Sequence, residues 1–123
     1  MFTGRLLAES LRIGIDLSVP GLWLTRLGRH DVGESTSPTQ PTVWTFVDFE
    51  VPDERVDDLA AGLAAGLLPD DGWYADFQSA DEHVVVFAGR AFRYRKGDAA
   101  ARQEVVAHGR AAGTPEHQLD WAG

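Results

Sequence analysis

The sequence predicts an α+β domain in which an antiparallel sheet of about five strands carries two helices on one face. Short segments rich in β-branched and aromatic residues alternate apolar with polar positions, which is typical of half-buried strands. Two other segments repeat apolar residues at helical spacing. The order of these elements is β–β–α–β–β–β–α, which favours a ferredoxin-like or closely related arrangement. With 123 residues and 44% hydrophobic content, residues 1–123 form a single domain with one core.

The first half of the chain predicts two strands and a loop between them. Residues 5–14 fit either a short helix or a strand, and their pattern does not decide. Residues 21–30 alternate like a strand, and residues 42–51 give the clearest strand, with Val43, Thr45, Val47, Phe49 and Val51 on one face. Ser, Thr and Pro crowd residues 33–41, so we expect a mobile loop around residues 31–41.

Each predicted helix has a recognisable start and stop. Asp53 is a candidate N-cap for a helix whose apolar stripe runs from Val56 to Leu67. Asp98 is a candidate N-cap for a second helix, which Gly113 and the proline that follows should end. After this helix, we expect Leu119 and Trp121 to pack back on the body.

Between the helices, residues 72–98 predict three strands joined by two tight turns. A turn at Ala80-Asp81 places Gln78 opposite His83 and Tyr74 opposite Phe87. A turn at residues 88–90 then aligns the third strand. One face of this ribbon is apolar and is assigned to the helices. The other face mixes aromatic and polar side chains, and its candidate ligand-binding residues are Tyr74, Asp76, Gln78, His83, Arg90, Phe92 and Tyr94.

Two members of this face are candidate catalytic residues. Asp76 is placed to orient His83, and an imidazole exchanges protons near neutral pH. A tyrosine could position a substrate, and Arg90 could hold an anion. The same residues also fit a structural interpretation, with His83 a partly exposed strand histidine and the aromatic side chains buried in a core or a dimer interface. The sequence leaves open whether the protein is an enzyme.

Composition restricts the partners. A net charge of −8 disfavours nucleic acid and anionic membranes. Residues 48–82 hold eleven acids and one base, while residues 90–110 hold six bases and two acids. This asymmetry indicates either pairing between elements or a basic patch for an anionic ligand. The histidines lack metal-ligand spacing, so neither a metal site nor another cofactor is expected. Zero cysteines and an N-terminus unlike a signal peptide favour the cytoplasm.

Three runs of sequence resemble a group of small uncharacterised proteins from high-GC actinobacteria. The runs are GWYADF, VVFAGRAFRYRKGD and AHGRAAGTPEHQLDW. The resemblance implies a compact, stand-alone cytoplasmic domain. It implies no activity and no catalytic residues.

Three functional hypotheses remain open at this point. The first is a binding or protein-interaction module that uses the open face of its sheet, as a homodimer or with a small anionic or aromatic ligand. The second is a small metal-free enzyme of dimeric α+β-barrel type, which transfers protons on an aromatic or polyketide-like metabolite. The third is an inhibitor or immunity-type protein that mimics an anionic surface through the acids of residues 48–82.

Overall fold

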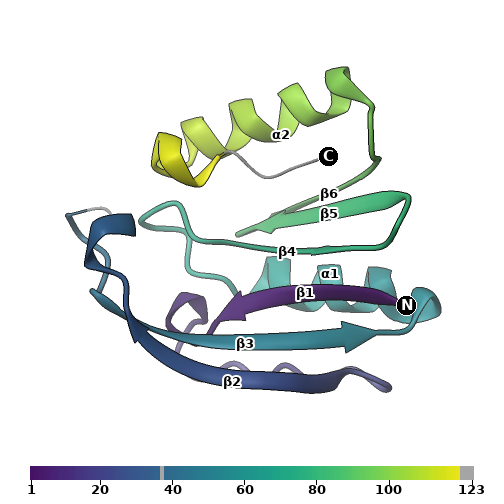
Figure 1. Cartoon of the computed structure of the whole chain (residues 1–123), viewed down its shortest axis with the longest axis horizontal. Coiled ribbons are helices and arrows are strands. Elements are labelled where there is room, and N and C mark those ends of the chain that lie inside the picture. The colour runs from purple at the N-terminus through teal and green to yellow at the C-terminus, as the bar shows by residue number, and fades with distance from the viewer. Residues whose placement is uncertain (37, 120–123) are drawn as a thin grey trace.

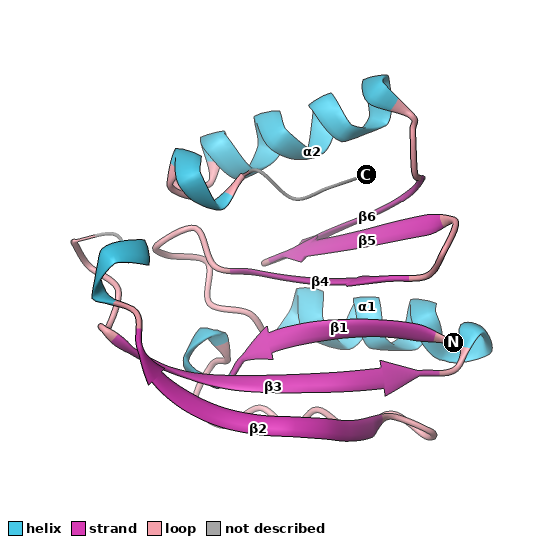
Figure 2. Ribbon diagram, viewed as in Figure 1, coloured by secondary structure: helices cyan, strands magenta, loops and turns pink. Residues whose placement is uncertain are grey.

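The computed structural model describes residues 1–36 and 38–119, and it is an α+β fold built on one antiparallel sheet of six strands. Figures 1 and 2 show the sheet with a long helix above it and a second helix behind it. The strands lie in the order β2-β3-β1-β4-β5-β6. The elements are β1 (Phe2–Leu7), β2 (Trp23–Asp31), β3 (Val43–Val51), α1 (Val56–Gly66), β4 (Tyr74–Gln78), β5 (Glu82–Phe87), β6 (Arg90–Arg95) and α2 (Ala99–Ala111).

The sixth strand is β1, which the sequence left undecided. It begins at Phe2, before the segment that we considered, and lies in the centre of the sheet between β3 and β4. Phe2 and Leu6 point into the core, whereas Thr3 and Arg5 are exposed. The strand ends at Leu7, where a 3-10 turn over Ala8–Ser10 redirects the chain. The predicted number of about five strands is therefore too low by one.

The two helices do not share a face of the sheet, contrary to the prediction. Leu59 and Leu63 of α1 pack in one buried cluster with Val84 and Val86 of β5. Val105 and Val106 of α2 pack in a separate cluster with Val85 and Phe87. Successive strand residues point to opposite faces, so these clusters lie on opposite sides of β5. The reason is that β5 is apolar on both faces, and both need cover. A ferredoxin-like arrangement is not confirmed.

The helix ends follow the prediction at α2 but not at α1. The Asp98 carboxylate accepts a hydrogen bond from the Ala101 amide at 3.0 Å, as expected of an N-cap. By contrast, Asp53 does not cap α1, because a 3-10 turn over Asp53–Arg55 precedes the helix and no side chain caps it. Leu119 is buried against α2 as expected. Trp121 lies outside the described residues.

The predicted loop between β2 and β3 has local structure. It contains a 3-10 turn at Gly33–Ser35, and its Gln40 side chain is buried and donates to the Asp71 carbonyl at 2.9 Å. Whether the loop is mobile stays a prediction, and its Ser37 lies outside the described residues. Among residues 1–36 and 38–119, no helix has the length and apolar character needed to cross a membrane.

Candidate functional site

The ribbon of β4, β5 and β6 has the register that the sequence predicted. Gln78 pairs with His83, and Tyr74 pairs with Phe87. On the next strand, His83 pairs with Tyr94. Because directly opposed residues point to the same face of an antiparallel pair, the predicted mixed face is real. All of its polar and aromatic members lie on the side of the sheet that α2 partly covers.

Three of these residues form a hydrogen-bonded chain across the strands. Nδ1 of His83 lies 3.0 Å from the Tyr94 hydroxyl, and Nε2 lies 2.9 Å from Oδ2 of Asp76. The His83 side chain is only 1% exposed and Tyr94 is buried, whereas the Asp76 side chain is 32% exposed. The imidazole therefore contacts its two partners and not a dissolved ligand. Of the three, Asp76 alone reaches the surface to a large extent.

The other predicted site residues are spread along this face. Gln78 is exposed at one end of β4. The Arg90 guanidinium lies 4.5 Å from the centre of the Phe92 ring, which packs under α2 beside His108. Tyr74 donates from its hydroxyl to the Gln118 carbonyl at 2.9 Å. Of the predicted ligand-binding residues, Tyr74 and Asp76 share a cavity, while Phe92 and Arg90 belong to the α2 contact.

That cavity, which we call the Asp76 cleft, opens where α2 stops covering the sheet. It has a volume of about 160 Å³. Its lining comes from β1, β3, β4, the residue before β4, and the segment after α2: Arg5, Leu7, Trp44, Phe46, Trp73, Tyr74, Asp76 and Gln118. The Trp44 and Trp73 rings meet edge to face, 5.5 Å apart. Four of the eight lining residues are thus aromatic, and one cation and one anion stand among them.

A row of alternating charges crosses the open part of this face. Arg26, Asp48, Arg5 and Asp76 are neighbours in the register of β2, β3, β1 and β4. Arg5 donates to both carboxylate oxygens of Asp48, at 2.7 and 3.2 Å, and lies 4.9 Å from the centre of the Phe46 ring. Opposite charges on facing strands stabilise a sheet, so the row orders the side chains around the cleft.

The same pairing moves two pKa values. Its hydrogen bond to Asp48 raises the pKa of Arg5, and the charges of Asp48 and Asp76 act in the same direction against the effect of burial. The hydrogen bond from Arg5 lowers the pKa of Asp48. Both groups stay ionised over the physiological range. Arg5 therefore presents a fixed positive charge beside the Asp76 carboxylate.

Sequence reasoning missed Arg5, Trp44, Phe46 and Trp73 as lining residues. Arg5 could not be assigned to a face of the sheet, because its segment fitted either a helix or a strand. A strand over residues 2–7 would have placed Arg5 on the same face as Thr3, beside an unknown neighbour. Trp44 and Phe46 lie on the face of β3 opposite its predicted apolar row. Two aromatic residues on a supposedly solvent-facing side were the available signal.

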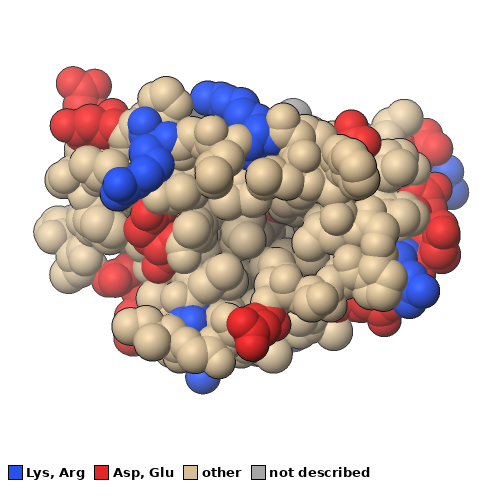
Figure 3. Space-filling view, turned by 90° about the horizontal axis from the view of Figure 1, so that it is seen from below, with Lys and Arg blue, Asp and Glu red and all other residues tan. Residues whose placement is uncertain are grey.

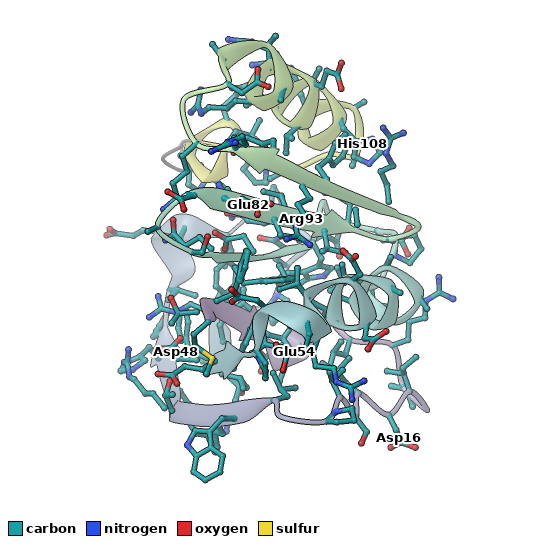
Figure 4. All side chains as sticks on the ribbon, turned by 90° about the vertical axis from the view of Figure 1, so that its right-hand side faces the viewer. Asp16, Asp48, Glu54, Glu82, Arg93 and His108 are labelled. Atoms are coloured by element: carbon teal, nitrogen blue, oxygen red, sulfur yellow. The ribbon has the colours of Figure 1, made fainter. Side chains whose placement is uncertain are left out.

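The predicted charge asymmetry resolves partly into pairing between elements. Arg93 of the basic segment donates to Glu82 at 2.6 Å and to Asp57 of α1 at 3.2 Å. Figure 4 shows Arg93 beside Glu82 on the ribbon. Arg110 also pairs with Glu116. Arg93 and Arg110 thus belong to ion pairs, and an anionic ligand at the other bases of the segment stays a prediction.

The cleft can therefore hold a flat ring among aromatic side chains, with Arg5 as a hydrogen-bond donor and Asp76 as an acceptor. Among the described residues, no group of three or more His, Asp or Glu side chains is placed to hold a metal ion. A scan against protein-family models, a search of curated proteins and a search of solved structures found no match to this chain. The resemblance to actinobacterial proteins accordingly stays a prediction.

Proposed function

We propose that the protein is a binding module that holds a small, flat aromatic molecule in the Asp76 cleft. The observation that carries this proposal is the composition of the cleft, which joins four aromatic side chains to Arg5 and Asp76 on the part of the sheet that α2 leaves open. Concave apolar sites with a few fixed polar groups are typical of small-molecule sites.

The charges select the polar groups of the ligand. Arg5 has five N–H donors, and two bonds from it reach Asp48. One carboxylate oxygen of Asp76, Oδ2, is hydrogen-bonded to His83. A ligand that offers both an acceptor and a donor beside one ring, such as a benzamide, satisfies this pair. The Asp76 carboxylate would repel a purely anionic ligand, and the Arg5 guanidinium would repel a purely cationic one.

The experiment titrates benzamide, phenol and benzoate separately into the protein and monitors binding through the NMR shifts of the backbone amides. We expect benzamide to bind best and to shift residues of β1, β3 and β4 around the cleft. Asp76→Asn should weaken binding. The matched control is Asp58→Asn, which removes an exposed carboxylate of α1 that pairs with Arg55, because α1 packs on the opposite face of the sheet from the cleft. Equal binding by both variants, or shifts confined to other elements, would refute the proposal.

A second candidate function is proton-transfer chemistry on an aromatic or polyketide-like metabolite. The hydrogen-bonded chain from Tyr94 through His83 to Asp76 favours it. In this version the Asp76 carboxylate accepts the proton, and His83 is a positioning residue because it is buried. The supporting result is turnover of a metabolite by the protein that Asp76→Asn abolishes even at substrate concentrations high enough to saturate the variant. Binding of the same compounds without turnover leaves only the binding module.

The same open face is our candidate for a homodimer contact. Trp23 of β2 pairs with Glu50, lies on this face and is 70% exposed. Large exposed aromatic side chains are typical of interaction surfaces. Size-exclusion chromatography with light scattering should detect a dimer that Trp23→Ser dissociates. A monomer at all concentrations tested would remove the homodimer from the proposal and leave the cleft unaffected.

A further inference from the structure

A second cavity lies on the opposite side of the sheet from the Asp76 cleft, and we propose that it binds an aliphatic chain with a positively charged head group. The segment of residues 11–22, which we call the lid segment, crosses this side between β1 and β2. The cavity beneath it has a volume of about 370 Å³, within the range of small-molecule sites. The proposal does not depend on the function of the Asp76 cleft.

The lining is apolar apart from one carboxylate. Aliphatic side chains come from the lid segment, the sheet and α1, and Phe49 is the single aromatic residue among them. The lining residues are Leu6, Leu11, Ile15, Asp16, Leu17, Leu22, Leu24, Val47, Phe49, Leu59 and Leu63. Water in such a space finds few hydrogen-bond partners, so the cavity favours an apolar occupant over solvent.

Both ends of the lid segment are fixed to the body. At its start, the Arg12 amide donates to the Gly66 carbonyl at 2.8 Å, and Leu11 forms a bridge with Leu67. At its end, Gly21 with φ +81° lies against Pro52, next to a turn within the segment in which the Leu22 amide donates to the Val19 carbonyl at 3.1 Å. The cavity is therefore bounded by a defined segment on one side and by the sheet on the other.

Between these ends the lid segment contacts α1 through its side chains. Ile15 and Leu17 lie so close to Gly66 and Gly62 that a Cβ atom built on either glycine would be 3.2 or 3.0 Å from them. Small residues on α1 thus let the lid segment approach the helix. The aliphatic side chains of the segment are half-buried, apart from the exposed Ile13, so the apolar space remains open at its edge.

The charge of the lining determines the head group. Asp16 is the one charged residue in the lining, and it is exposed. In Figure 4, Asp16 stands at the periphery and on the other side of the molecule from Asp48. A carboxylate at the opening repels an anionic head group and attracts an ammonium group. The net charge of −8 acts in the same direction. A fatty acid is therefore disfavoured, and an alkylammonium compound is favoured.

The view from the β2 side agrees with this assignment. Figure 3 shows that uncharged side chains occupy the middle of this end of the molecule, and that charged ones stand mostly around its rim. Leu24 and Leu27 of β2 are 54% and 63% exposed. Leu24 lines the cavity and Leu27 does not. These two leucines supply a matched pair of variants.

The experiment compares octylamine, octanol and octanoate, all below their micelle concentrations, by calorimetry and by methyl NMR of the wild-type protein. We expect affinity to fall in that order, and we expect methyl shifts at Leu63 and Val47 inside the cavity. Asp16→Asn should weaken octylamine by roughly three- to fivefold, the size of an exposed charge interaction, and should leave octanol unchanged.

Leu24→Trp should block the opening and weaken all bound compounds by roughly tenfold or more. Leu27→Trp, a substitution of the same type on the same strand, should bind like the wild type. Both positions are exposed, so both variants should fold. Failure of octylamine to bind up to millimolar concentration would overturn the proposal, as would octanoate binding as tightly as octylamine. Equal binding by the two tryptophan variants would also overturn it. The alkyl chain would then lie on the general surface of the protein or in a contact between two copies.

Discussion

Nε2 of His83 lies 2.9 Å from Oδ2 of Asp76, and the imidazole between Asp76 and Tyr94 is 1% exposed. The first prediction follows from this burial. His83→Ala should lower the free energy of unfolding by about 2–4 kcal/mol, because it leaves a cavity and deprives two polar groups of their partner. Urea unfolding measures the change. His117→Ala, which removes an exposed imidazole, is the control. A variant as stable as the wild type would show that the chain of hydrogen bonds contributes nothing to stability.

The second prediction concerns the close contact of two neighbouring strands. A Cβ atom on Gly4 of β1 would lie 2.4 Å from Cβ of Phe77 and 2.4 Å from the Asp76 carbonyl oxygen of β4. Both neighbours belong to the centre of the sheet and cannot move aside easily. Gly4→Ala should therefore cost about 3 kcal/mol in the free energy of unfolding.

Gly28→Ala is the matched control for this experiment, because it adds the same methyl group to the edge strand β2. Its Cβ atom would meet only the ends of flexible side chains, the nearest being Nε2 of His30 at 3.2 Å. We expect a change within about 0.5 kcal/mol. If Gly4→Ala were as mild as Gly28→Ala, then β1 and β4 would not approach as closely as the structure shows.

The sequence predicted the ribbon of β4, β5 and β6 well because its turns are short. A two-residue turn leaves one register, and the alternation of strand residues then assigns each side chain to a face. The pairing of Gln78 with His83 and of His83 with Tyr94 followed from this geometry alone. Local geometry could not predict how deeply His83 is buried, because its burial depends on where α2 packs.

The helix faces were mispredicted for a related reason. Val84 and Val86 on one side of β5, and Val85 and Phe87 on the other, are all apolar. A strand that is apolar on both faces indicates cover on both, and this pattern argued against two helices on one side. The polar residues of the opposite face were given too much weight, because the apolar Val85 and Phe87 on that face also need cover.

The lining of the Asp76 cleft was the least predictable part, because it depends on pairing between strands far apart in the chain. Arg5, Asp48 and Asp76 meet only because β1 lies between β3 and β4. No turn joins β1 to either neighbour directly. Long-range pairing of this kind has no signature in a local pattern.

The third prediction concerns Glu9, whose carboxylate replaces a strand partner beyond the end of β1. It accepts hydrogen bonds from the Thr45 amide at 2.6 Å and from the Thr45 hydroxyl at 2.7 Å. Burial acts to raise the pKa of Glu9, but the hydrogen bonds from Thr45 outweigh it and lower the pKa below its ordinary value.

A lowered pKa means that the unfolded chain binds the proton more readily than the folded one. The contribution of Glu9 to stability is therefore fully present above the ordinary glutamate pKa, and it is lost as pH falls through the folded value. At neutral pH, Glu9→Gln should cost about 1 kcal/mol in the free energy of unfolding. The difference between variant and wild type should shrink in acid. A difference that stays constant between pH 7 and pH 3 would contradict this assignment.

The last prediction concerns the packing of α2 on the ribbon and its dependence on pH. The His108 ring lies 4.8 Å from the Phe87 ring and 5.3 Å from the Phe92 ring, centre to centre. Figure 4 shows His108 on the side of α2 near the ribbon. Burial lowers the pKa of His108, and the positive charge of Arg90 lowers it further. Protonation therefore works against the docking of α2.

Because the folded protein binds the His108 proton less readily than the unfolded chain, stability should fall as pH drops below about 6.5, the ordinary histidine value. The decline should level off once pH is below the folded pKa of His108. Urea unfolding between pH 8 and pH 5 measures this, and His108→Asn isolates it from the other histidines, because the variant keeps every other titrating group. We expect the pH dependence of the variant to be weaker than that of the wild type. Identical pH profiles for the two proteins would mean that the imidazole is as accessible to protons in the folded chain as in the unfolded one.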